Sequence, residues 1–368
     1  MRHISELAQI LRTQLPLDKR KLEAVVQVIV AIIFLRTVNL TSLAKHLGGK
    51  AELRSRYRRI QRLIHEWPRH TDWLGPWLLT WFFKPEEPLT LTMDRTNWQI
   101  GKCKVNFLMI GVVYRRMAIP LMWTLLPKKG NSNFSERRAL LDRLFKHIPK
   151  SRVKNLLCDR EFVGNEWFDW LKKQKIPFKI RIKDNYLVLT KGGKKTTVEA
   201  LFYDLPRGHQ KSAGLRLITA KGIKTYLTGS RLESGELMVI ASDSPCSQAI
   251  EAYSERWEIE TLFHCLKTRG FDFEATHITD YARLSALMQL TAIAACWCVR
   301  TGEWKIEQGH LIKLKNHGRP SKSLFRHGLD HLADTLGRAT CWRLQKPLVA
   351  LWRTLVPNHP SELGLYVI

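Results

Sequence analysis

Hydrophobic and polar positions alternate in the middle of the chain. A short polar stretch at 84–88, KPEEP, separates this part from what precedes it. Residues 89–126 then contain three successive patterns typical of β-strands, around LTLTMDRTNW, KVNFLMIGVVYRR and MAIPLMWTLLP. The sequence IGK at 100–102 predicts a turn between the first two strands. The pattern therefore predicts three consecutive strands that begin a sheet.

Helical and strand patterns alternate after these three strands. Ser135 is predicted to cap a helix that runs to about residue 148, and VKNLLCD at 153–159 is a short apolar strand. A helix at 165–174 and the strand PFKIRI at 177–182 follow. Three strands, helix, strand, helix, strand is the order of a ribonuclease-H-like mixed sheet. The predicted fold class is therefore α/β.

The predicted core is interrupted once. Residues 183–236 are rich in Gly and Lys and contain strand-like segments, which predicts an inserted β-subdomain. The strand LMVIAS at 237–242 returns to the core, and helical patterns dominate afterwards. We therefore expect a catalytic core of residues 86–182 and 237–300, followed by a helical C-terminal region at 301–368.

Residues 1–85 show helical periods and few strand patterns. The longest apolar run, AVVQVIVAIIFL at 24–35, is interrupted by a Gln and is shorter than the roughly 20 residues that span a bilayer. It is interpreted as a buried core helix. The first residues, MRHISELAQILR, lack the unbroken apolar segment of a signal peptide. No membrane association is expected.

A helix-turn-helix is predicted within this region. Short helical patterns at 42–47 and 51–66 flank a Gly48-Gly49 break. In the second helix one stripe is predicted to be buried, and it consists of Leu53, Tyr57, Ile60 and Ile64. Three arginines point elsewhere together and are candidates for DNA contact: Arg54, Arg58 and Arg62. The alternative is a basic helix exposed to solvent without a specific partner.

The charge of the chain indicates a polyanionic partner. Sixty Lys and Arg against 33 Asp and Glu give a net charge of +27, and residues 1–85 alone contain 15 against 6. Such a surplus suits nucleic acid rather than a small neutral substrate. Thirteen Trp and 45% hydrophobic residues indicate that a packed scaffold carries this charge. The seven Cys form no CxxC pair, which argues against a zinc module or a disulfide framework and favours a reducing, intracellular location.

One helical stretch after the predicted core strands carries a polar stripe. In YSERWEIETLFHCLK at 253–267, a continuous helix would place Tyr253, Arg256, Glu260 and Lys267 on one narrow face. The adjacent arc is apolar and is predicted to face the core through Ile259, Leu262, Phe263 and Leu266. One carboxylate among phosphate-seeking groups suggests a phosphodiester site. The alternative is a solvated face with no function beyond solubility.

Three acids could form a metal centre. Asp94 is expected to close the strand LTLTMD and Asp159 ends the strand NLLCD, so both occupy positions where an unpaired carboxylate would be costly to bury. Together with Glu260 they could supply hard oxygen ligands to two Mg²⁺ ions about 4 Å apart. Taken singly, either Asp could instead begin a turn or cap a helix.

The segments around these acids resemble the DDE cut-and-paste transposases of the insertion sequence four family. The resemblance rests on the signature Tyr253-x2-Arg256-x3-Glu260-x6-Lys267, on MDRTNW and CDREF around the two Asp, and on LPKKGNSNFSERRALL and HGRPSKSLFRHGLD. It implies that Asp94, Asp159 and Glu260 are the catalytic, metal-binding triad. Tyr253, Arg256 and Lys267 would then contact the phosphates of the transposon end.

The resemblance also implies partners and a cofactor. The expected substrates are double-stranded DNA, namely terminal inverted repeats and target DNA, and the expected cofactor is two Mg²⁺ ions, for which Mn²⁺ would substitute. A homodimer in the DNA complex and a bacterial cytoplasmic location at the nucleoid follow from it. Two alternatives stay open: a domesticated DNA-binding protein without catalysis, and another ribonuclease-H-like nuclease such as a junction resolvase.

Overall fold

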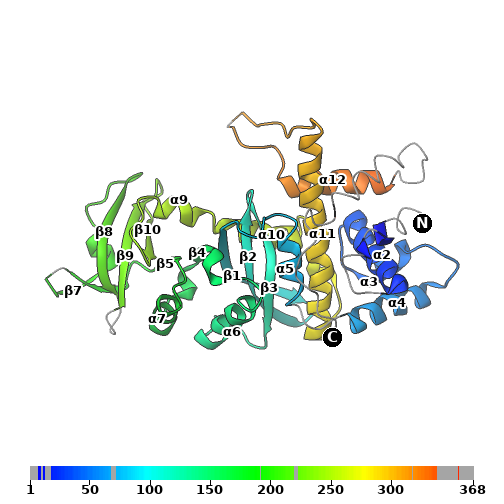
Figure 1. Cartoon of the computed structure of the whole chain (residues 1–368), viewed down its shortest axis with the longest axis horizontal. Helices are drawn as coiled ribbons and strands as arrows, with labels where there is room; N and C mark the ends of the chain where they lie inside the picture. Colours follow the sequence, from blue (N-terminus) through cyan, green and yellow to red (C-terminus); the bar gives the residue numbers. More distant parts are fainter. Residues whose placement is uncertain are drawn as a thin grey trace.

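The computed structural model describes residues 7–9, 11–12, 18–67, 72–190, 192–218, 223–316, 318–337 and 355 (Figure 1). Its α-helices are α2 (Lys19–Leu35), α3 (Leu40–His46), α4 (Leu53–Glu66), α5 (Leu74–Leu79), α6 (Phe134–Leu144), α7 (Asn165–Lys173), α8 (Val198–Leu201), α9 (Ala249–Ser254), α10 (Trp257–Leu266), α11 (Tyr281–Glu307) and α12 (Leu324–Gly337). Short 3₁₀ turns are η1 (Lys150–Arg152), η2 (Arg160–Phe162) and η3 (Phe273–Ala275). The strands are β1 (Leu89–Ile100), β2 (Cys103–Tyr114), β3 (Met117–Leu126), β4 (Val153–Cys158), β5 (Phe178–Ile182), β6 (Leu187–Leu189), β7 (Lys195–Thr197), β8 (Gln210–Ile218), β9 (Ile223–Arg231) and β10 (Leu237–Ser242).

The described strands form one mixed sheet in the order β3-β2-β1-β4-β5-β10-β9-β8-β6-β7. The strands β1, β2 and β3 are antiparallel neighbours, and β4 and β5 join the other side of β1 in parallel. Strand β10 then pairs with β5 in the antiparallel sense. This arrangement confirms the predicted α/β class and its ribonuclease-H-like mixed sheet.

The hairpin of β1 and β2 is longer than the sequence suggested. Ile100 pairs with Cys103 across the predicted turn, where Gly101 has a φ of +56°. The expectation that Asp94 closes its strand is wrong, because β1 continues to Ile100. The parallel pairing of β1 with β4, however, ends at Met93 and Cys158. Asp94 therefore lies in mid-strand at the level where its neighbour β4 stops.

The segment 183–236 extends the core sheet. Its strands β6, β7, β8 and β9 follow β10 in the strand order, and β9 pairs with β10 along the whole length of β10. In Figure 1 these strands occupy the end of the molecule that is far from the N-terminal helices. Their backbone hydrogen bonds therefore continue the sheet that also contains β1 and β4.

Helices cover the central strands. In Figure 1, α6 and α7 lie below these strands, and α10 contacts β1, β2 and β3. The predicted cap of α6 at Ser135 is wrong: Asn133 caps it, since its side chain accepts the Glu136 N–H at 2.9 Å while the Glu136 carboxylate accepts the Asn133 N–H at 2.7 Å. This reciprocal pair fixes the start of α6, which ends at Leu144 and not near 148.

The long helix α11 stands between the sheet and the N-terminal helices (Figure 1). It contacts α2, α4, α5, α10, α12 and β3. The expected boundary at 300/301 falls inside this helix. By length and composition α11 could cross a membrane, but 83% of its most apolar 18 residues are buried inside the protein. The helices α2 and α3 would be long enough only together, and the chain bends by 105° between them.

Helix α4 packs against α2, α3 and α11. Ile60 and Ile64 are buried as predicted, and Tyr57 is half-buried against the core. The prediction for Leu53 is wrong, because 38% of it is exposed. Leu53 is the first residue of the helix and lies beyond the neighbours that cover the following turns.

Candidate active site

The register of β1 and β4 brings two acids together. Met93 and Cys158 are the last paired residues of these parallel neighbours, so Asp94 and Asp159 follow at the same level of the sheet. The carboxylate of Asp159 has no hydrogen-bond or ion-pair partner within the described part of the chain. Two carboxylates side by side, one of them unpartnered, form an acceptor-only site suited to a cation.

Asp94 is held in a partly desolvated environment. Its side chain is 14% exposed. Burial raises the pKa of Asp94 to about 7, although nearby Arg256 and the Arg95 N–H, which donates to Oδ1 at 2.7 Å, oppose the rise. The neighbouring negative charges of Glu161 and Asp159 raise this pKa further. A positive charge at this position would therefore stabilise the ionised form.

The stretch 253–267 is not the continuous helix that the sequence suggested. Helix α9 ends at Ser254 and α10 begins at Trp257. Between them the backbone bonds span three residues, from Arg256 N to Tyr253 O at 2.9 Å and from Ile259 N to Arg256 O at 3.2 Å. Such 3₁₀-type bonds turn the chain faster than an α-helix does, so the four signature residues do not form one exposed stripe.

Arg256 connects two of the predicted triad acids. Its Nη1 donates to Asp94 Oδ2 at 3.1 Å and its Nη2 donates to Glu260 Oε1 at 2.5 Å. The side chain of Arg256 is 6% exposed, whereas that of Glu260 is 44% exposed. Glu260 is therefore linked to Asp94 through a buried guanidinium. The apolar face predicted for this segment is buried, at Ile259, Leu262, Phe263 and Leu266.

The other two signature residues lie on either side of this ion pair. Tyr253 is 1% exposed, and its ring centroid is 5.8 Å from the Arg256 guanidinium carbon. Its hydroxyl is buried without a partner in the described structure, and burial raises its pKa. Lys267 caps the C-terminus of α10, is half-buried, and donates from Nζ to the Asn97 carbonyl at 3.0 Å. Lys267 therefore lies beside the distal part of β1.

A second charged pair, Arg95 and Glu161, lies at the site and was not predicted from the sequence. Arg95 follows Asp94, and its guanidinium binds the Glu161 carboxylate through Nε at 3.2 Å and Nη2 at 3.0 Å. Arg137 in turn donates from Nη2 to the Glu161 carbonyl at 2.9 Å. Arg95 and Glu161 both lie within MDRTNW and CDREF, so their place beside the two Asp was the available signal. This pair holds together the segments that follow Asp94 and Asp159.

The arginines of α4 form a separate surface. Arg54, Arg58 and Arg62 are exposed, and α4 contacts other helices rather than the strands that carry the acids. The structure thus brings Asp94, Asp159, Arg256 and Glu260 together and leaves the α4 row elsewhere.

The strands β1 and β4 and the helix α10, which carry or precede these acids, lie within a region that matches a known family. The family model of the transposase DDE domain covers residues 86–297. The protein is a DDE transposase. This match confirms the resemblance found in the sequence. A comparison with curated proteins gave no match. The matched region begins just before β1 and ends within α11, so α2, α3, α4 and α12 lie outside it.

Transposases of this family generally depend on a divalent cation, and the donor set of this chain fits one. Asp94 and Asp159 are adjacent hard oxygen donors in a site where burial disfavours unneutralised negative charge. In the described residues no three His, Cys, Asp or Glu side chains are grouped closely enough to hold a metal ion. Glu260 is hydrogen-bonded to Arg256 instead. Asp94 and Asp159 would hold the ion first.

Proposed function

We propose that this transposase binds the terminal inverted repeats of a bacterial insertion sequence and catalyses Mg²⁺-dependent strand cleavage and strand transfer. The adjacent positions of Asp94 and Asp159, with Glu260 linked to Asp94 through Arg256, are the observation that carries the proposal. The protein would act in the cytoplasm, at the nucleoid, and as a homodimer on DNA. Mn²⁺ would substitute for Mg²⁺.

The triad of Asp94, Asp159 and Glu260 would hold two metal ions. These ions, when bound, supply Lewis-acid activation of the attacking hydroxyl and stabilisation of the leaving oxygen. The register of β1 and β4, which puts Asp94 and Asp159 at the same level of the sheet, supports this role, and Glu260 on α10 would join them by leaving Arg256. Arg256 holds Asp94 and Glu260 in one arrangement, and the Arg95–Glu161 pair keeps the two strand ends together.

The remaining signature residues differ in how they would serve the DNA end. Lys267 donates to a neutral carbonyl, which a phosphate oxygen could replace as the acceptor. Tyr253 and Arg256 are buried, so their primary role would be to position Asp94 and Glu260, and contact with a phosphate would need a change of partner. Residues 1–85, through Arg54, Arg58 and Arg62, would bind the terminal repeat.

Cleavage of the element's own terminal repeat tests the proposal. Purified protein should cleave this duplex with Mg²⁺ or Mn²⁺ and lose cleavage in excess chelator. The variant Glu260→Gln, which keeps the shape of the side chain, should lose cleavage and retain binding of the duplex. Cleavage that persists in chelator would contradict the assignment of the triad.

The same experiment distinguishes an active transposase from a domesticated DNA-binding protein without catalysis. Such a protein would bind the repeat and never cut it, with either cation and at any protein concentration. All three acids are present and two of them are adjacent in the structure, which favours the active enzyme.

A further inference from the structure

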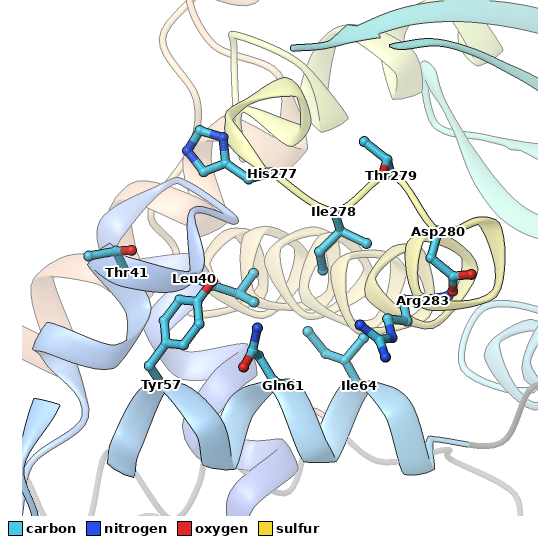
Figure 2. Close-up of a pocket in the computed structure, with 10 residues that line it drawn as sticks. All are labelled: Leu40, Thr41, Tyr57, Gln61, Ile64, His277, Ile278, Thr279, Asp280 and Arg283. Atoms are coloured by element: carbon cyan, nitrogen blue, oxygen red, sulfur yellow. The ribbon is translucent and has the colours of Figure 1, made fainter. Parts of the chain in front are cut away.

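A groove separates α4 from the chain that leads into α11. This hollow has a volume of about 200 Å³. In Figure 2, Gln61 and Ile64 point from α4 toward residues 277–283, and Arg283 points back toward α4. A wider groove of about 600 Å³ adjoins it and shares Gln61 and Arg283 with it. The wider groove is lined by Ser55, Arg58, Gln61, Arg62, His65 and Arg283.

The wider groove is basic, and no described acid in its lining balances the positive charge of its arginines. These arginines, Arg58, Arg62 and Arg283, are exposed. None of these three arginines has an ion-pair partner among the residues that the structure describes. Asp280 borders the smaller hollow, but its carboxylate accepts the Arg283 backbone N–H at 2.9 Å and so caps α11. The arginine side chains therefore remain available to an external anion.

The two walls of the groove are fixed to each other. At the C-terminal end of α4, Trp67 Nε1 donates to Gln289 Oε1 of α11 at 3.0 Å in a buried contact. At the other end, Asn39, which caps α3, donates to the Ala275 carbonyl at 3.1 Å. Arg58 and Arg62 on one wall and Arg283 on the other are thus held by contacts at both ends of the groove.

One wall is also connected to the catalytic strand. Glu274 Oε1, which lies just before this wall, accepts the Gln99 backbone N–H of β1 at 2.8 Å. Strand β1 carries Asp94. The groove wall and the strand that carries Asp94 are therefore joined by a hydrogen bond.

We propose that this groove binds backbone phosphates of duplex DNA, with Arg283 contributing a contact from the catalytic part of the chain opposite Arg58 and Arg62. The inference rests on the proposed function and extends it, since no motif assigns Arg283 a role. Arginine binds phosphate with forked geometry, and Ser55 and Gln61 add neutral donors. The lining contains no Tyr, Trp or Phe on which an unpaired base could stack, which favours duplex over single strands.

The variant Arg283→Gln in the full chain tests this proposal. It removes the charge and keeps the backbone N–H that Asp280 caps, so α11 should still form. We expect about fivefold weaker binding near 0.1 M salt and a plot of log affinity against log salt that is shallower by about one. The loss should be equal for the terminal repeat and a scrambled duplex, because a phosphate contact carries no sequence information.

A matched control is Arg138→Gln, which removes one positive charge from α6, outside the groove. It should bind like the wild type. A second variant, Gln61→Glu, places negative charge in the groove and should weaken binding to both duplexes; thermal unfolding of each variant verifies folding.

The outcomes separate the two proposals. Wild-type protein that fails to bind the terminal repeat would overturn the proposed function. If Arg283→Gln and Arg138→Gln both bound DNA with the affinity and salt dependence of the wild type, only the proposed role of the groove would be overturned. A loss confined to the terminal repeat would show that Arg283 reads bases and would overturn the assignment of a phosphate contact.

Discussion

Asp94 and Arg62 are both charged, yet the protein surrounds them in different ways. Asp94 is 14% exposed and bonded to Arg256, whereas Arg62 is exposed and has no ion-pair partner in the described chain. The same contrast holds for the two regions as a whole. The acid centre, which consists of Asp94 and the acids beside it, also contains Arg95, Arg137 and Arg256. The wider groove beside α4 is lined by no acid among the described residues.

The difference follows from the cost of burying charge. A partly desolvated carboxylate is unfavourable unless a cation or hydrogen-bond donor compensates it, so the acid centre contains its own arginines. An exposed arginine keeps its hydration and needs no partner until a polyanion replaces the counterions. The basic residues behind the net charge of +27 therefore fall into two groups. One group is paired with partly buried acids, and only the exposed group is available to bind a polyanion.

The largest expected effects are a loss of DNA cleavage without a loss of binding in one variant, and the reverse in another. Asp159→Asn should reduce cleavage of the terminal repeat by about 10³-fold or more, because the site loses an anionic donor, while binding stays within about twofold. The double variant Arg58→Gln with Arg62→Gln should bind about tenfold or more weakly yet cleave normally once the DNA is saturated with protein. Gel-shift and single-turnover cleavage assays measure the two quantities. If both variants lost binding and cleavage together, the two regions would not be separable.

A second prediction concerns stability in the absence of DNA and divalent cations. Arg256→Met should lower the free energy of unfolding by about 3 kcal/mol, because it leaves Asp94 partly buried without its cation. Arg256→Lys should fall between this variant and the wild type, since an ammonium cannot reproduce both forked contacts. Urea unfolding followed by circular dichroism gives these values.

Arg58→Met is the matched control for this prediction. It removes an exposed arginine and should change the free energy of unfolding by no more than about 0.5 kcal/mol. Equal losses for Arg58→Met and Arg256→Met would refute the contrast between compensated and free arginines.

The smallest expected effect concerns His331, which is half-buried and has one nearby acid, Asp334. Burial, with help from Lys305, lowers the pKa of His331 on α12 to about 4. The unfolded state therefore binds the proton more tightly, and stability is complete above about pH 6.5 and is lost as the pH falls toward 4. His331→Gln should reduce the fall in Tm between pH 7 and pH 4.5 by a few °C. An identical fall in wild type and variant would show that His331 does not titrate with unfolding.

The sequence determined the elements and their order. Alternation at β1 to β3, the apolar run of β4 and the helical period of α10 are local patterns, which backbone geometry converts directly into strands and helices. The resemblance to transposases, carried by the signature and the two Asp motifs, is confirmed by the family match. The fold class and the positions of Asp94 on one strand and Asp159 at the end of another were therefore predictable.

Tertiary structure decided which charges meet. A constant 100° per residue placed Tyr253, Arg256, Glu260 and Lys267 on one exposed face, but the chain tightens between α9 and α10, which buries Tyr253 and Arg256. Arg256 meets Asp94, 162 positions away in the sequence, because sheet register and helix packing bring them together. Arg283 faces α4 for the same reason. Local patterns specify which side of an element is apolar, whereas the partner of a polar side chain depends on contacts that form only when distant elements pack.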